Sequence, residues 1–167
     1  TDTATVTVTN YDSATVSIAD QTTAENSGPS VVTLSVDNAV QGGFWVTVRR
    51  ADGTATTADS DYTAGTDNVS FAGNAGESQT VSVVLGSDLK VEDNETLTLS
   101  IGSVSRLGIT ITDTGTVKIQ NDDTAAVTID NVSVAENVVG GQVTVTLILD
   151  KPVQGGFDVD VSTDNGT

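Results

Sequence analysis

The chain repeats itself at an interval of about 110 residues, and this feature constrains its fold more than any other. Three pairs of segments carry the repeat: residues 5–12 with 116–123, residues 24–26 with 135–137, and residues 40–44 with 153–157. The first two pairs are offset by 111 residues and the third by 113, so a two-residue insertion falls in a surface turn. A unit of this length fits one β-sandwich, whereas solenoid repeats have only about 20 to 45 residues.

The repeat also predicts how the chain is organised. Residues 1–12 correspond to the closing strand of one repeat, residues 13–123 to a complete repeat, and residues 124–167 to the N-terminal part of a following repeat. A partial sandwich exposes an apolar face and unpaired strand edges, so neighbouring polypeptide from the same chain or an adjacent subunit is expected to cover the last part. The apolar side chains concerned are Val145, Leu147, Leu149, Phe157, Val159 and Val161.

Within the complete repeat, apolar and polar side chains alternate with a period of two residues, as half-buried antiparallel strands require. Seven short runs of this kind are separated by turns rich in Gly, Asn and Asp. The predicted inward-facing residues are Val16, Ile18, Val32, Leu34, Val36, Phe44, Val46, Val48, Val69, Phe71, Val81, Val83, Leu85, Leu97, Leu99, Ile101, Val117 and Ile119. This pattern predicts an all-β fold, an immunoglobulin-like antiparallel β-sandwich, and leaves the pairing of the strands open.

The composition narrows the possible functions. With 23 acidic and 6 basic residues the net charge is −17, which argues against nucleic acid as a partner and favours cations. The sequence has neither Cys nor His, which excludes thiolate nucleophiles, Ser-His triads and structural zinc sites. No apolar run approaches the roughly 18 residues of a membrane-spanning helix, so no membrane insertion is expected in this stretch.

The acidic residues are concentrated between the predicted strands, at Glu25 and in the segments 58–62, 87–95 and 121–123. A single Asp or Asn in a turn usually caps the backbone. Several carboxylates at one pole of a sandwich would instead repel one another, by up to about 4 kcal/mol for each close pair near a protein surface. Calcium takes about six to eight oxygen ligands and is often held by converging loops. The sequence therefore favours a calcium site if these loops share a pole.

The complete repeat also carries an ordered set of short motifs: Ala24-Glu25-Asn26, Gly53-Thr54-Ala55, Ser60-Asp61-Tyr62-Thr63, Val69-Ser70-Phe71, Gly76-Glu77, Ser87-Asp88 with Glu92 and Glu95, and Asn121-Asp122-Asp123. In this order they resemble the Calx-beta family. These are tandem calcium-binding β-sandwich repeats of bacterial surface proteins, related to the regulatory domains of sodium-calcium exchangers. The resemblance covers the whole of the complete repeat.

The resemblance implies direct calcium coordination by Glu25, Asp61, Asp88, Glu92, Asp122 and Asp123, with Glu95 as a further candidate. Ser87 and Asn121 stand where calcium-rich members often have another Asp, and the lower ligand charge predicts one to three ions per repeat. Asp12 is expected to close a site of the preceding repeat, and Glu136 to open a site of the following one.

Trp45 alternates with Phe44 and Val46, so it is expected to face outward, and the following repeat has Asp158 at the equivalent position. An outward Trp is compatible with binding of a glycan or a neighbouring domain, but single exposed aromatic side chains are also common. Whether this chain binds a glycan or a protein ligand is therefore left open by the sequence.

The expected function is a calcium-binding structural repeat of an extracellular, bacterial cell-surface stalk, adhesin or filament, in which calcium stiffens the joints between neighbouring repeats. The alternative is a calcium-sensing regulatory module, in which calcium changes the geometry between domains. A glycosidase that uses Glu92 and Glu95 as its carboxylate pair is disfavoured, because the chain offers no aromatic-lined cleft. The protein is therefore expected not to be an enzyme.

Overall fold

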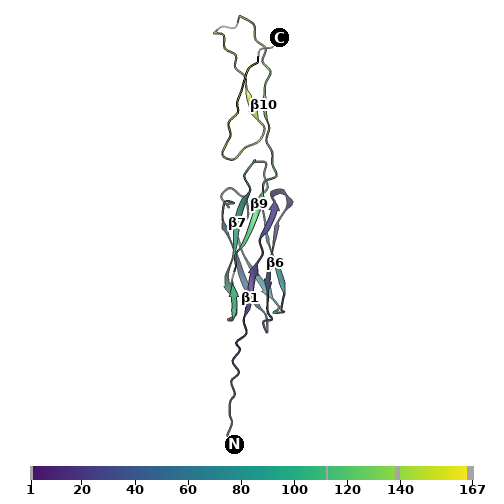
Figure 1. Ribbon diagram of the computed structural model, residues 1–167, viewed down its shortest axis with the longest axis vertical. Helices are drawn as coiled ribbons and strands as arrows, with labels where there is room; N and C mark the ends of the chain where they lie inside the picture. Colours follow the sequence, from purple (N-terminus) through teal and green to yellow (C-terminus); the bar gives the residue numbers. More distant parts are fainter. Residues whose placement is uncertain (1, 112, 138–139, 165–167) are drawn as a thin grey trace.

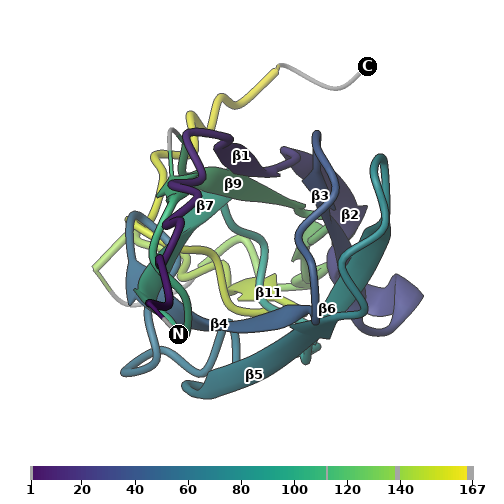
Figure 2. The same ribbon diagram turned by 90° about the horizontal axis from the view of Figure 1, so that it is seen from below.

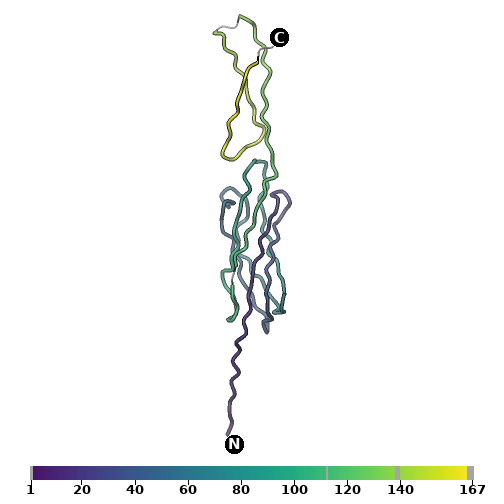
Figure 3. Tube along the Cα trace, in the orientation of Figure 1, coloured from purple at the N-terminus to yellow at the C-terminus, as the bar shows by residue number. Residues whose placement is uncertain are grey.

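The computed structural model describes residues 2–111, 113–137 and 140–164. The molecule is elongated, with the N-terminal segment, a β-sandwich and a smaller C-terminal unit following one another along its long axis (Figures 1 and 3). Within the described ranges, the helical part is the 3-10 turn η1 (Glu25–Ser27). None of the described segments forms a helix long and apolar enough to cross a bilayer.

Two sheets form the sandwich and, viewed along the long axis, enclose a common interior (Figure 2). The first sheet has the order β6 (Ser78–Val83), β3 (Ser30–Val36), β1 (Ala14–Ile18) and β8 (Ile109–Ile111). The second has the order β2 (Gln21–Ala24), β9 (Gly115–Gln120), β7 (Glu95–Val104), β4 (Phe44–Asp52) and β5 (Thr66–Phe71). The strand pairs are antiparallel apart from β1–β8 and β2–β9, which are parallel. The chain therefore passes from one sheet to the other between β1 and β2.

The core is made by the inward-facing side chains of both sheets. Val16, Leu34 and Leu97 are completely buried, and the rings of Phe44 and Phe71 stack with their centroids 4.9 Å apart. The predicted alternation is confirmed, although Leu85 and Ile101 are only partly buried against the core. Trp45 is 44% exposed on the outer face of β4, as its place in the alternation predicts.

Three features of the sheets were not predicted. The strands β2 and β8 have four and three residues, too few for a clear alternation. A bulge between β4 and β7 pairs Thr47 with Ser103 but Val48 with Ile101, so one extra residue of β7 has no partner. Ile101, which is only partly buried, directly precedes the extra residue, Gly102.

The C-terminal unit contains one antiparallel pair, β10 (Val127–Ile129) and β11 (Leu147–Leu149). The six side chains for which a cover is expected, Val145, Leu147, Leu149, Phe157, Val159 and Val161, are 39% to 53% exposed. The covering polypeptide stays a prediction. Only six residues separate the end of β9 at Gln120 from the start of β10 at Val127. The acidic end of the sandwich therefore faces the next unit directly.

Candidate metal site

Loops from distant parts of the chain meet at the end of the sandwich that faces the C-terminal unit, here called the acidic pole. Glu25 lies in η1 after β2, and Asp61 lies between β4 and β5. The connection from β6 to β7 contributes Asp88 and Glu92, and Asp123 follows β9. Calcium sites built from converging loops need this kind of convergence, which a sequence alone cannot establish.

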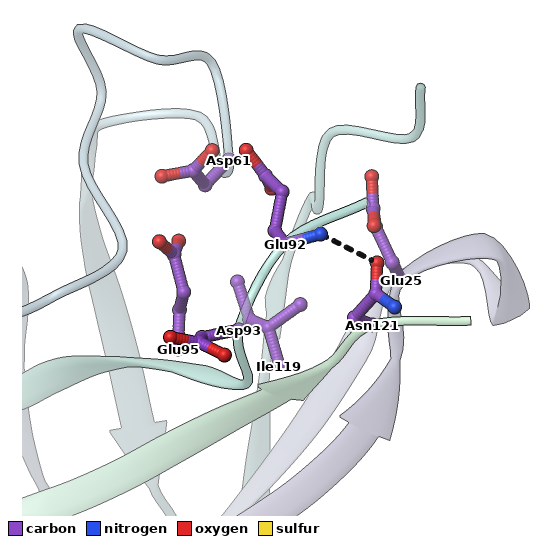
Figure 4. Close-up of a pocket in the computed structure, with 7 residues that line it drawn as sticks. All are labelled: Glu25, Asp61, Glu92, Asp93, Glu95, Ile119 and Asn121. Atoms are coloured by element: carbon purple, nitrogen blue, oxygen red, sulfur yellow. Dashed lines mark hydrogen bonds between the residues drawn. The ribbon is translucent and has the colours of Figure 1, made fainter. Parts of the chain in front are cut away.

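The carboxylates of the acidic pole form two groups. The first cluster contains Glu25, Asp88 and Asp123, and the second cluster contains Asp61, Glu92 and Glu95. Within each cluster, one carboxylate oxygen from every residue lies within 4.8 Å of the others. Figure 4 shows the second cluster together, with Glu25 beside Asn121. Two oxygens that each lie about 2.4 Å from one calcium ion are at most about 4.8 Å apart, so both clusters fit a shared cation.

Close backbone packing holds Asp61 in place. The Gly86 N–H donates to the Asp61 carbonyl at 2.8 Å, and a Cβ at Gly86 would lie 1.9 Å from the Ser60 carbonyl oxygen. Ser60 itself has a φ of 73°, a left-handed conformation that non-glycine residues seldom adopt. The Asp61 carboxylate also accepts the Thr56 N–H at 2.6 Å. Only glycine at position 86 permits this approach of the two loops that carry Asp61 and Asp88.

Asn121 and Asn94 hold the remaining loops together. The Asn121 side chain accepts the Glu92 N–H at 3.1 Å and donates to the Asp123 carbonyl at 3.0 Å. The Asn94 side chain accepts the Asn121 N–H at 3.1 Å. Asn121, where calcium-rich Calx-beta sequences often have Asp, therefore connects a residue of the second cluster to one of the first.

Several solved structures have the same architecture as this chain. The apo-form Calx CBD1 domain matches with a TM-score of 0.57 and 22% identity, over 65% of this chain and 98% of that domain. CBD12 from CALX1.2 matches with a TM-score of 0.60 and 22% identity, over 68% and 49%. The calcium binding domain CBD12 of CALX1.1 matches with a TM-score of 0.58 and 22% identity, over 65% and 44%. The sandwich has the Calx-beta fold.

This chain spans about half the length of the two CBD12 structures. No protein-family profile and no curated protein matches the chain. The Calx-beta fold is established by the match to the solved structures.

Burial and crowding disfavour negative charge at the two most buried carboxylates of the Calx-beta sandwich. Burial raises the pKa of Glu25. The hydrogen bond from the Asp88 N–H lowers this pKa, whereas the negative charges of Asp88, Glu92 and Asp123 raise it further. Burial and the neighbouring Asp61 together raise the pKa of Glu95 to about 7. Each of these two side chains is only 8% exposed. A bound cation would remove this penalty, because it favours the charged form of every carboxylate around it.

Two lysines approach the clusters. Lys90 forms an ion pair with Glu92, which raises the pKa of Lys90. Lys151 of the C-terminal unit lies 3.3 Å from an Asp123 carboxylate oxygen. Together they offset part of the negative charge of the acidic pole.

The predicted ligands are distributed unevenly. Five of the six, Glu25, Asp61, Asp88, Glu92 and Asp123, fall in the two clusters together with the further candidate Glu95. Asp122 is exposed and belongs to neither cluster. Asp12 and Glu136 are also exposed, and the described residues contain no further acidic cluster around them. Calcium coordination by the six predicted residues stays a prediction.

Sequence reasoning missed the approach of the C-terminal unit to this site. Besides Lys151, Gln154 donates its side-chain amide to the Glu95 carboxylate at 3.4 Å. The available signal was the segment Val-Gln-Gly-Gly-Phe, which occurs in both repeats at residues 40–44 and 153–157.

Proposed function

We propose that the acidic pole binds calcium and that calcium stiffens the joint between this repeat and the next. The observation that carries the proposal is the pair of three-carboxylate clusters, each with its oxygens within 4.8 Å of one another. At an effective dielectric constant of about 20, two unit charges about 4 Å apart repel by about 4 kcal/mol. A divalent cation in each cluster converts this repulsion into attraction.

Calcium suits these ligands better than other common cations. All six side chains are carboxylates, the hard oxygen donors that calcium and magnesium prefer. Three carboxylates supply up to six oxygens, and the flexible geometry of calcium tolerates ligands from different loops, whereas magnesium demands a nearly ideal octahedron. One of the structures with this fold is itself named as a calcium binding domain. We therefore propose Glu25, Asp88 and Asp123 as ligands of one ion, and Asp61, Glu92 and Glu95 as ligands of a second.

We further propose a structural role, as one repeat of an extracellular, bacterial cell-surface stalk, adhesin or filament. The short connection from Gln120 to Val127 places the clusters beside the joint, so an ion bound there restricts the hinge directly. Neighbouring repeats are the partners in this arrangement. The high negative charge of −17 also suits a calcium-rich environment.

The second candidate is a calcium-sensing regulatory module. The CBD12 structures share this fold. A sensor would use the same carboxylates of the acidic pole as ligands. Affinity separates the two candidates, because sensor sites have dissociation constants of about 10⁻⁷ to 10⁻⁵ M and extracellular modules about 10⁻⁴ to 10⁻³ M. Isothermal titration of the metal-free protein with calcium measures this constant.

We propose no catalytic role for Glu92 and Glu95. The cavity that they line together with Glu25, Asp61 and Asn121 has a volume of only about 10 Å³. This space holds one water-sized body rather than a sugar ring. A carbohydrate-hydrolysis screen with no turnover is the expected result.

Thermal unfolding tests calcium binding. Melting in 5 mM calcium and in excess chelator is expected to show a clear upward shift with calcium, since a ligand at 100 times its dissociation constant stabilises the folded state by about 2.7 kcal/mol. The double variant Asp88→Ala with Asp123→Ala should lose the contribution of the first cluster. The matched control, Asp158→Ala with Asp160→Ala, removes two exposed carboxylates outside both clusters. An unchanged melting temperature of the native protein would exclude calcium binding at the pole.

Small-angle scattering tests the structural role. The full chain is expected to be extended and stiff with calcium, and more flexible in chelator, because unneutralised carboxylates beside the short connection repel one another. The same maximum dimension and flexibility in both conditions would contradict a calcium-stiffened joint.

A further inference from the structure

A turn of the C-terminal unit is joined to the sandwich by backbone hydrogen bonds. The Val91 N–H donates to the Pro152 carbonyl at 2.9 Å, and the Gln154 N–H donates to the Val91 carbonyl at 2.9 Å. Val91 and Val153 thus form a parallel β-bridge between the loop before β7 and the turn after β11. This contact uses main-chain groups on both sides and contains no carboxylate.

Two side chains of the same turn reach past the bridge, one to each acidic cluster. Lys151 contacts Asp123 of the first cluster at 3.3 Å, and Gln154 contacts Glu95 of the second cluster at 3.4 Å. The segment that forms the bridge therefore contacts both clusters. This arrangement fixes the position of the next unit relative to both.

The turn is a recurring element, because Val-Gln-Gly-Gly-Phe occurs at residues 40–44 and again at 153–157. Both copies have the same conformation. The paired glycines have φ angles of 80° and 70° in the first copy and 74° and 70° in the second. The second glycine N–H donates to the valine carbonyl in each, at 3.1 Å for Val40 and 3.3 Å for Val153. Two consecutive left-handed residues favour glycine strongly.

The first copy of the turn lies at the opposite end of the sandwich, next to the N-terminal segment. A cavity of about 290 Å³ opens there, lined by Asn10 and by residues 12–14, 39–41 and 106–109. Residues 10–12 are the sequence equivalents of residues 121–123, and Asp123 contacts Lys151, two residues before the second copy of the turn. The Asn38 amide also donates to the Ser13 carbonyl at 3.1 Å. The same two segments therefore come together at both ends of the sandwich.

We infer that the Val-Gln-Gly-Gly turn is the docking element through which each repeat binds the repeat before it. Its partner surface is the loop around Val91, and the cavity beside Val40 receives the corresponding loop of a preceding repeat. The part of this inference that assumes a series of neighbouring repeats rests on the proposed function. The docking contact itself forms without calcium, because the bridge consists of uncharged main-chain groups, and calcium then stiffens a joint that is already assembled.

Disulfide trapping in the full chain tests the docking contact. The sequence has no cysteine, so Val91→Cys with Val153→Cys introduces a single possible pair. Bridged residues on neighbouring strands lie about 5 Å apart, within the range for a disulfide. The control pair, Val91→Cys with Val143→Cys, places the second thiol at an exposed site about ten residues away along the C-terminal unit. Mild oxidation is expected to cross-link the first pair at least tenfold faster than the control, at the same rate in calcium and in chelator.

Hydrogen exchange of the native chain gives an independent measurement that needs no variant. In chelator, the Val91 and Gln154 amides should exchange at least tenfold more slowly than those of Val6 and Val8, which lie in the exposed N-terminal segment. Cross-linking no faster than the control, or fast exchange of both amides, overturns the docking contact. Cross-linking that appears only with calcium overturns its independence from the metal. A chain that cross-links in chelator but binds no calcium would instead refute the proposed function and leave the docking contact intact.

Discussion

The turn that carries Glu77 and the acidic pole use the same kind of side chain in opposite ways. The Glu77 carboxylate accepts the backbone N–H groups of Ala72 at 2.8 Å, Gly73 at 2.8 Å and Asn74 at 3.1 Å, and the Gln79 amide at 3.0 Å. These donors lower the pKa of Glu77 to about 2, and the hydrogen bond from the Ala72 N–H has the largest effect. At the acidic pole, burial and neighbouring carboxylates raise the pKa of Glu95 to about 7.

The difference in hydrogen-bond donors and in pKa distinguishes a structural carboxylate from a candidate metal ligand. Glu77 holds its own turn together and needs no further partner, because donors surround its negative charge. Glu25 accepts one N–H, from Asp88 at 3.0 Å, and Glu95 accepts one amide at 3.4 Å, while each faces other carboxylates. An acidic residue in a turn is therefore informative only once its donors are known.

The largest expected effect comes from neutralising the second cluster. Asp61→Asn with Glu95→Gln should abolish the contribution of that cluster to calcium-dependent stability, about 2.7 kcal/mol at 100 times its dissociation constant. In chelator the same variant should melt higher than the native protein, because burial and repulsion no longer oppose folding. Calcium titration should show one ion fewer. Unchanged stoichiometry would remove these residues from the ligand set.

The pH dependence of stability should reverse with calcium. The folded-state pKa of Glu95 is about 7 against an ordinary value of 4.5, so its protonated form favours folding at low pH. This contribution is lost as the pH rises from about 4.5 through about 7. In chelator the melting temperature should therefore decline over this range. With calcium it should rise, because the metal binds only the ionised ligands, and parallel curves in the two conditions would contradict this.

Glu77→Gln is expected to lower the melting temperature by a few degrees, equally in calcium and in chelator. The substitution leaves several backbone N–H groups with a weaker acceptor. Because the pKa of Glu77 is lowered to about 2, its contribution is present above about pH 4.5 and is lost as the pH falls toward 2. The difference between variant and native protein should shrink in acid. A loss confined to calcium-containing buffer would place Glu77 in the metal site instead.

The smallest effect is expected at Asp122, which the sequence predicts as a ligand but which lies exposed outside both clusters. Asp122→Asn should change stability by less than about 0.5 kcal/mol and leave the calcium stoichiometry unchanged. The neighbouring Asp123→Asn, in contrast, should weaken calcium binding. Equal losses in the two variants would restore Asp122 to the ligand set.

The sequence alone predicted the repeat, the sandwich and most of its core. The reason is that the period of two follows directly from strand geometry, so Leu34, Val46 and Leu97 could be assigned inward without any knowledge of their partners. The ordered motifs likewise predicted which loops are acidic. Both kinds of information are local, so they can be recognised in the sequence without a tertiary structure.

Only the tertiary structure decided how the acidic residues are grouped and what touches them. The division into two clusters depends on the close approach of Gly86 to Ser60 and on the Asn121 side chain, and these contacts join positions far apart in the chain. The bridge from Val91 to Val153 joins residues 62 positions apart, and the recurring segment at 153–157 does not by itself name its partner. The packing of loops depends on such long-range contacts. The sequence therefore predicted the candidate ligands, whereas only the fold determined which residues surround them.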